Sequence, residues 1–318
     1  MQSANPAPHN DPPAMPQVTG STSVYLILGD PVEQVRAPES FNALFARHGI
    51  DAILVPVHVA PENLAAFVPA AFLAPNIKGM WVTIPHKMQI IDLLTHCTPA
   101  ARASGAVNAI RRNPDGSLSG ALFDGIGFLA GLDHAGIAYA GRRVLVLGAG
   151  GAAAAIGAAL ASGLQACREL AFYDPATTRA VDLATHIREG ASAQVCAVGS
   201  NDPSGFDLVI NASPLGLNAS DGMPCDIARM PPHAAYADIL MKNQPTPAVR
   251  AAWARGLTAQ PGFEMMIQQT HLYLDFFGFA AAAQAVQRDY DAIRQRIYPA
   301  GLVGVSPRPA DPPLHQLA

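Results

Sequence analysis

The sequence has little that would suit a secreted, metal-binding or nucleic-acid-binding protein. Its 318 residues include four cysteines and no C-x-x-C pair. We therefore expect reduced thiols in a cytoplasmic protein, with neither a disulfide framework nor a zinc site. The ten histidines form no H-E-x-x-H motif, so no metal is predicted. Charged residues make up only 14%, the formal net charge is -4 and like charges do not cluster, which argues against a nucleic-acid partner.

Long apolar runs are also missing. The alanine-rich run from Gly151 to Ala161 is too short and too rich in glycine to span a bilayer, so we expect no membrane partner. The start, "MQSANPAPHNDPPAMPQVTGSTS", lacks the basic and apolar regions of a secretory signal, and its composition predicts a flexible tail over 1–22. The end, "SPRPADPPLHQLA", has the same character and predicts a second tail over 299–318.

Half of the residues are apolar, which is enough for two domains with their own cores. In the first part, "SVYLILGD", "DAILVPVHV" and "IKGMWVTIP" are predicted strands. Predicted helices over 38–48, in "PENLAAFVPAAF" and over 88–94 follow them in turn. A second α/β unit begins at "RRVLVLGAGGAAAAIGAAL". This alternation predicts an α/β fold with mostly parallel sheets, and the helical end of the chain is expected to pack back on the first unit.

The loop after the strand in "RRVLVLGAGG" fits G-x-G-x-x-A through Gly148, Ala149, Gly150, Gly151 and Ala152. Glycines there allow a tight turn and a close approach to a pyrophosphate, which the following helix N-terminus attracts.

An acid, Asp174, follows the next predicted strand, "ELAFY". Its carboxylate can accept hydrogen bonds from the ribose of NAD and would repel the 2′-phosphate of NADP, so NAD is the expected cofactor. The same side chain could instead cap the helix that starts at Pro175, and the two roles are compatible.

The stretch "WVTIPHK" raises a separate question, because an apolar strand stops at Pro85 and then presents Lys87. Open α/β sheets place their sites at the carboxyl ends of strands. An amine there could take the proton of an alcohol whose hydride leaves, provided that desolvation moves the pKa of the amine toward neutrality. From this stretch alone, a solvated lysine in a first helical turn is the simpler interpretation.

Several motifs in order resemble the shikimate dehydrogenase family, which includes quinate/shikimate dehydrogenases. They extend from about Val24 to Tyr290 and read "LGDPVEQVRAPESFNALF", "GMWVTIPHK", "ASGAVNAI", "GALFDGIGFLAGL", "LVLGAGGAA", "VINASPLG", "ADILMKNQPTP" and "GFEMMIQQ". The resemblance implies a substrate-binding α/β domain over 23–124, completed by helices over 262–298, and a Rossmann-type dinucleotide-binding domain over 125–261. It also implies reversible NAD(P)-dependent hydride transfer to or from a ring secondary alcohol, such as the C3 hydroxyl of shikimate.

The same motifs imply roles for individual residues. Lys87 matches the catalytic lysine of the family, and Asp124 matches its aspartate partner. The implied substrate positions are Thr83, Asn108 and Gln269. The implied cofactor positions outside the glycine loop and Asp174 are Asn211, Ser213, Ile239 and Gly262.

Three departures from the family pattern bear on specificity. Val35 and Ala37 stand where the family binds the substrate carboxylate with two serine hydroxyls. Trp81 replaces a common asparagine; strand alternation would put it on the face of Thr83, at the substrate, although packing into the core is the other interpretation. These changes predict that shikimate is a poor substrate. The basic motif of NADP-dependent members is also missing, since Pro175 and Ala176 follow Asp174.

The leading interpretation is therefore an NAD-preferring dehydrogenase of a small cyclic alcohol. One alternative is an ordinary NADP-dependent shikimate dehydrogenase of chorismate and aromatic amino acid biosynthesis. An alternative of another class is a dinucleotide-binding regulatory protein without turnover, against which Lys87 and Asp124 argue. A methylene-tetrahydrofolate dehydrogenase-like enzyme fits the motifs less well. The physiological substrate, the favoured direction and the presence of a homodimer stay open.

Overall fold

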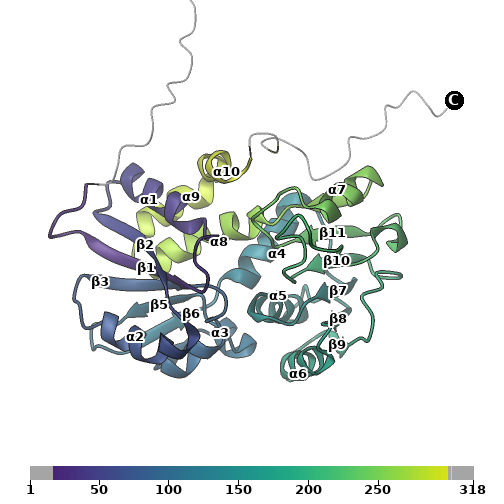
Figure 1. The fold of residues 1–318 in the computed structure, drawn as a ribbon, viewed down its shortest axis with the longest axis horizontal. Coiled ribbons are helices and arrows are strands. Elements are labelled where there is room, and N and C mark those ends of the chain that lie inside the picture. The colour runs from purple at the N-terminus through teal and green to yellow at the C-terminus, as the bar shows by residue number, and fades with distance from the viewer. Residues whose placement is uncertain (1–16, 300–301, 303–318) are drawn as a thin grey trace, which may run out of the picture.

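The computed structural model describes residues 17–299 and 302, and it places two sheets side by side (Figure 1). The first sheet consists of β1 (Ser23–Gly29), β2 (Ala52–His58), β3 (Ile77–Val82), β4 (His96–Cys97), β5 (Ala109–Arg112) and β6 (Leu118–Ala121). The second consists of β7 (Arg143–Leu147), β8 (Glu169–Tyr173), β9 (Gln194–Ala197), β10 (Leu208–Asn211), β11 (Ala235–Asp238) and β12 (Thr258–Gln260).

The first sheet has the order β2-β1-β3-β5-β6-β4 and is mixed. The strands β1, β2 and β3 are parallel, as the alternation of strands and helices predicts. The strand β5 then pairs antiparallel with both β3 and β6. These short strands lie in the motif region around "ASGAVNAI", where the sequence gives no clear strand pattern.

The second sheet is parallel throughout, with the order β12-β11-β10-β7-β8-β9. The chain starts at β7 in the middle, builds outward to β9, and then returns to β10 on the other side of β7. This is the doubly wound arrangement of dinucleotide-binding folds, in which ligands bind at the carboxyl edge where the strand order reverses. That reversal lies between β7 and β10.

Apolar clusters lie on both faces of each sheet, so the central strands bury apolar side chains on two sides, while the edge strand β2 stays partly exposed. The helices are α1 (Ala37–Arg47), α2 (Leu64–Ala71), α3 (Pro99–Ser104), α4 (Asp124–Ala135), α5 (Gly151–Ala161), α6 (Thr177–Arg188), α7 (Pro247–Ala254), α8 (Phe263–Phe276), α9 (Ala280–Arg288) and α10 (Asp291–Ile297). Short 3-10 turns are η1 (Pro61–Asn63), η2 (Gln89–Leu93) and η3 (Ile227–Arg229).

The C-terminal helices return to the first sheet, which confirms that expectation. Side chains of α8, α9 and α10 share one apolar core with β1 and α1. In Figure 1 these helices, drawn in yellow-green, lie beside the purple α1, and α8 and α4 lie between the two sheets. The helix α4 packs on both α5 and α8, so it connects the two halves of the molecule.

Two further expectations need comment. The predicted helix over 88–94 is only the 3-10 turn η2. Of the predicted tails, 1–16, 300–301 and 303–318 lie outside the described residues. Within the N-terminal one, Thr22 is already tied to the fold, because its hydroxyl donates to Asp51 over 2.7 Å. No helix in the described part of the chain is long and apolar enough to cross a membrane.

Candidate active site

The lysine motif sits at the carboxyl edge of the first sheet, where β1 and β3 end together. The amide of Thr83 donates to Leu28 O over 2.9 Å, and the amide of Asp30 donates to Ile84 O over 3.0 Å. These bonds extend the β1–β3 pairing beyond the last strand residue. The following turn then carries Lys87 out of the sheet and toward α4.

Lys87 and Asp124 form an ion pair in which Lys87 Nζ donates to Asp124 Oδ2. The two side chains are 12% and 3% exposed, so the pair is almost fully shielded from water. Asp124 is the first residue of α4, where the helix N-terminus favours a negative charge. An amine held in this way by a buried carboxylate has a fixed position and few competing partners.

His86 anchors the turn that carries the lysine. Its ring is fully buried, and Nε2 lies 2.8 Å from Val59 O. Burial lowers the pKa of His86, although that carbonyl and the charge of Asp30 act in the opposite direction. A neutral imidazole that donates to Val59 fits this setting. The sequence analysis did not single out this histidine.

Asn108 connects three parts of the site. Its Nδ2 donates to Gln269 Oε1 over 3.1 Å, and its Oδ1 accepts from the amide of Phe123 over 3.1 Å. Phe123 directly precedes Asp124. The three substrate positions implied by the family motifs thus lie on the same side of the molecule as the ion pair. Thr83 follows the end of β3, four residues before Lys87, and Asn108 and Gln269 contact each other.

Two donors of this group are unused. Within the described residues, neither the hydroxyl of Thr83 nor Nε2 of Gln269 has a hydrogen-bond partner. Both belong to residues near the ion pair. They are available for hydroxyl or carbonyl oxygens of a bound molecule.

Val35 and Ala37 bring no polar group to this region. Ala37 is 7% exposed, and Val35 packs against the same apolar core beneath α1. Arg36, between them, forms an ion pair with Glu39. The loop after β1 therefore offers apolar side chains and an arginine whose charge is already paired.

The expectation that Trp81 faces the substrate is wrong for this structure. The indole is 2% exposed, stacks on Tyr273 at 5.2 Å and meets Phe41 edge-on at 4.9 Å. The strand β3 ends at Val82, so the two-residue alternation cannot be extended from Trp81 to Thr83. Trp81 Nε1 is buried and has no partner within the described residues.

The glycine loop lies at the reversal point of the second sheet. Gly148 has a φ of 111°, and a side chain there would come within 2.7 Å of Ala212 O. Gly151 faces the other half of the site, since a Cβ on it would lie 3.3 Å from Lys87 Cβ. The first residue of α5 therefore packs directly on the stem of the lysine, and the two predicted sites form one site.

Asp174 is bonded to the glycine loop. Its Oδ2 accepts from the amide of Ala149 over 3.0 Å, and its Oδ1 accepts from the amide of Ala176 over 3.0 Å. This position beside the loop is compatible with the ribose role. The capping alternative is not confirmed, because α6 begins at Thr177 rather than at Pro175 and no side chain caps it; the bond to Ala176 closes a turn before the helix. Arg179 Nη1 lies 3.9 Å from Asp174 Oδ2, with its side chain 59% exposed.

The other implied cofactor positions also converge on the carboxyl edge of the second sheet. Ser213 donates its hydroxyl to Asn211 Oδ1 over 2.6 Å, directly after β10. A side chain on Gly262 would collide with the backbone of Ile239 and Leu240. The glycine at the start of α8 is therefore required for the close contact with the loop after β11.

The sequence analysis missed two buried polar groups, Asp238 on the cofactor side and Tyr273 on the substrate side. Asp238 is fully buried and accepts from the hydroxyl of Thr246 over 2.8 Å and from the amide of Leu240 over 3.0 Å. On the other side, the hydroxyl of Tyr273 donates to Asn108 O over 3.3 Å. Burial and the charge of Asp124 hold the pKa of Tyr273 well above its ordinary value, so it remains a donor. An acid that ends a buried strand, as in "AYAD", is a signal that could have identified Asp238.

Comparisons with known proteins agree with this geometry. The family description "Shikimate dehydrogenase substrate binding domain" matches residues 27–110. A protein of Rubrobacter xylanophilus named shikimate dehydrogenase (NADP(+)) is 37% identical over 261 residues, covering 80% of this chain and 90% of that protein.

Solved structures resemble the whole arrangement. A shikimate dehydrogenase in complex with NADP+ superposes with a TM-score of 0.75 and 26% identity, covering 87% of this chain and 98% of that one. The 5-ketofructose reductase of Gluconobacter sp. strain CHM43 has a TM-score of 0.72 and 26% identity, covering 85% and 99%. With the relative of 37% identity along most of its length, these likenesses show that the chain belongs to the shikimate dehydrogenase family.

Proposed function

We propose that the protein is a nicotinamide-dependent oxidoreductase that interconverts a ring secondary alcohol, shikimate or a related compound, and the corresponding ketone. The observation that carries this proposal is the contact between the two halves of the site. The buried ion pair of Lys87 and Asp124 lies against Gly151, the first residue of the helix that follows the glycine loop. A proton-transfer group and a dinucleotide-binding loop are therefore adjacent.

Lys87 is the proposed acid–base group. When the alcohol is oxidised, its hydroxyl proton passes to Lys87 Nζ in the neutral amine form, and in the reverse direction the resulting ammonium returns a proton to the carbonyl oxygen. A bound dinucleotide supplies the hydride acceptor or donor. Asp124 fixes the amine through the hydrogen bond from Nζ, and the burial of both side chains keeps water from replacing the substrate hydroxyl.

Thr83, Gln269 and Asn108 orient the substrate in this proposal. The free hydroxyl of Thr83 and the free Nε2 of Gln269 bind ring oxygens, and Asn108 holds the Gln269 amide in one orientation by donating to its Oε1. Neither donor belongs to the buried polar atoms of the described residues that lack a partner, so water can satisfy both in the free protein and oxygens of a bound substrate would take its place.

NAD is the proposed preferred cofactor. The carboxylate of Asp174, fixed beside the glycine loop, retains lone pairs for the ribose hydroxyls and repels a 2′-phosphate. Two observations favour NADP instead. The Rubrobacter relative is named for NADP(+), and Arg179 lies near the carboxylate, where it could meet a phosphate. The kcat/KM values with NAD and with NADP separate these two possibilities.

The substrate is proposed to lack a carboxylate at the end near α1. Val35 and Ala37 offer no hydroxyl, and the charge of Arg36 is paired. Hydrogen bonds to a charged group contribute about 1.5–3 kcal/mol each, so two missing donors weaken carboxylate binding strongly. The Gluconobacter neighbour is named for 5-ketofructose, a sugar, which supports this choice.

The function is tested by following the nicotinamide absorbance with shikimate, quinate, aminoshikimate and neutral cyclic alcohols, each with NAD and with NADP. Turnover of at least one ring alcohol is expected. If the protein binds a dinucleotide tightly but turns over none of these compounds, the regulatory alternative replaces the proposal.

The substrate class is tested with shikimate and its methyl ester. The ester should have the higher kcat/KM, and Val35→Ser with Ala37→Ser should reverse the order. A kcat/KM for shikimate above about 10⁴ M⁻¹s⁻¹ would mean that other groups bind the carboxylate.

A further inference from the structure

We propose that Arg294, on the C-terminal helix α10, is a positioning residue for the active site, which it controls by holding the first turn of α8 through Glu264. This inference rests on the proposed function, because its readout is turnover of the alcohol. Arg294 is remote in sequence from every motif residue and touches none of the reacting groups.

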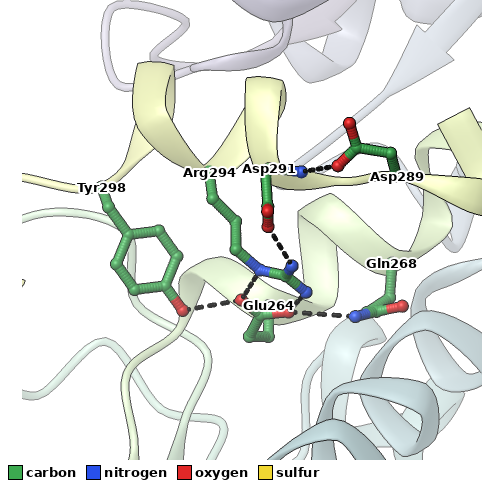
Figure 2. A network of polar contacts seen from close by, with 6 residues as sticks. All are labelled: Glu264, Gln268, Asp289, Asp291, Arg294 and Tyr298. Atoms are coloured by element: carbon green, nitrogen blue, oxygen red, sulfur yellow. Dashed lines mark hydrogen bonds and ion pairs between the residues drawn. The ribbon is translucent and has the colours of Figure 1, made fainter. Parts of the chain in front are cut away.

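Glu264 is the centre of a polar network between α8 and α10 (Figure 2). Arg294 donates to both of its oxygens, from Nε over 2.9 Å to Oε1 and from Nη2 over 3.1 Å to Oε2. The hydroxyl of Tyr298 donates to Oε1 over 2.9 Å, and Gln268 Nε2 donates to Oε2 over 3.1 Å. Asp291 accepts from Arg294 Nη1 over 3.1 Å, which fixes the guanidinium from the α10 side.

The network keeps a charge in the interior. Glu264 is 3% exposed, and burial by itself would raise the pKa of its carboxyl group. The hydrogen bonds and the positive charge of Arg294, with Gln268 and Tyr298, lower that pKa below its ordinary value instead. The glutamate is therefore ionised and needs its arginine, since a buried charge without a partner is strongly destabilising.

The backbone around Glu264 is packed too closely to move alone. A Cβ built on Gly131 of α4 would lie 3.1 Å from Glu264 Cβ, and one on Gly127 would lie 2.8 Å from Gln269 Cβ. The turn of α8 from Glu264 to Gln269 thus rests directly on α4. A displacement of this turn would shift α4, whose first residue is Asp124.

The same turn reaches the substrate side by hydrogen bonds. Gln269 Oε1 accepts from Asn108, and Asn108 accepts from the amide of Phe123, the neighbour of Asp124. Releasing α10 from Glu264 should therefore misplace the Gln269 amide and Asp124 together. A misplacement of about 1 Å in such groups can reduce the rate by about 10²-fold.

The test removes both charges at once, because Arg294→Met alone would leave a buried, unpaired glutamate and could unfold the protein. In the double variant Glu264→Leu with Arg294→Met, we expect kcat/KM for the alcohol to fall about ten- to a hundredfold. The dissociation constant of the dinucleotide should change less than kcat/KM does, because the glycine loop is held by the second sheet and only Gly262 among the implied cofactor positions adjoins this turn. Arg294→Lys, which keeps the charge but loses the forked geometry, should give an intermediate value.

The matched control is the pair Arg143 and Glu169 in the second sheet, joined by two bonds of 2.8 and 3.1 Å. Arg143→Met with Glu169→Leu removes another two-bond Arg–Glu pair, one that is more exposed, and should leave kcat/KM unchanged. Wild-type kcat/KM for the alcohol in the Glu264 and Arg294 double variant, or an equal loss in the control, would overturn the proposal. Turnover by the wild type is a separate measurement, so a failure of the proposed function is recognised independently.

Discussion

At the carboxyl edge of the second sheet, the cofactor positions meet mainly through backbone. Gly148 approaches Ala212, Gly151 approaches Lys87, and the amide of Ala149 holds Asp174. At the edge of the first sheet, by contrast, the positions meet through side chains. Lys87 donates to Asp124, and Asn108 donates to Gln269, 161 residues further along the chain.

This difference determines which substitutions the cofactor side and the substrate side tolerate. A backbone site needs residues small enough for a close approach, and the ligand contacts do not depend on side-chain identity. A side-chain site depends on each functional group, so one substitution changes what it binds. Val35 and Ala37 are the changes of this kind that we propose, and α1 and the first sheet form with them in place. The proposed substrate specificity therefore rests on side chains of the substrate side.

The largest effect is expected for Lys87→Ala. If the amine moves the substrate proton, kcat should fall by about 10²–10⁴. Dinucleotide binding should remain nearly unchanged, because the lysine meets the cofactor side only through its stem at Gly151. Steady-state kinetics and fluorescence titration of the dinucleotide measure the two quantities.

Lys78→Ala is the control, since Lys78 is an exposed lysine on the same strand β3. It should behave like the wild type. Turnover of Lys87→Ala within about threefold of the wild type would assign proton transfer to another group.

A buried side-chain network on the cofactor side, formed by Asp238 with Asn211 and Thr246, gives the next prediction. Burial raises the pKa of Asp238 from 3.8 to about 6, against the hydrogen bonds from Leu240 and Thr246. Between these values the folded protein holds a proton that the unfolded chain releases. The free energy of unfolding should therefore decrease as the pH rises from about 4 to above 6, by at most about 3 kcal/mol from this group.

Asp238→Asn removes this titration. Urea unfolding at pH 4.5 and at pH 7.5 should show that the variant gains stability relative to the wild type as the pH rises. An equal difference at both pH values would contradict a raised pKa of Asp238.

A smaller effect is expected for cofactor choice. Asp174→Asn removes the repulsion of a 2′-phosphate and should narrow the preference for NAD over NADP by about tenfold. Arg179→Ala serves as the opposite probe. If Arg179 does not bind a phosphate, kcat/KM with NADP stays within about threefold of the wild type. A wild-type preference for NADP that Arg179→Ala abolishes would instead assign Arg179 to the 2′-phosphate.

Local patterns in the sequence were sufficient to predict the parallel strands and the glycine loop. The glycine loop is a contiguous motif between a strand and a helix, and its geometry follows from those few residues. Contacts between distant segments could not be obtained in that way. Nothing near Glu264 in the sequence identifies Arg294 as its partner, and the antiparallel pairing of β5 has no strong alternation.

The misplacement of Trp81 has a similar cause. Its orientation depends on where β3 ends and on four aromatic side chains from β1, α1, α8 and the residue after α8. A single-strand pattern contains neither fact. Family motifs imply which positions form the site, but the direction of each side chain is decided by tertiary packing.

The last prediction compares the two tryptophans, one in each half. Trp81 Nε1 is buried without a partner among the described residues, whereas Trp253 Nε1 donates to Ala259 O over 3.0 Å. Trp81 is 2% exposed and packs among four aromatic rings, whereas Trp253 is only partly buried, so replacing Trp81 by Phe leaves the larger cavity. Trp253→Phe in turn loses the hydrogen bond to Ala259 O, while Trp81→Phe removes an unsatisfied donor, and this difference of about 1 kcal/mol acts in the opposite direction. Trp81→Phe should therefore be the more destabilising of the two in urea unfolding, by less than the cavity term alone would give. KM for the alcohol should change less than about twofold in Trp81→Phe, because a core ring does not touch the substrate. An increase in KM beyond about twofold that a loss of stability does not explain would contradict this. It would place the indole at the substrate site, with its free N–H bound to a substrate oxygen.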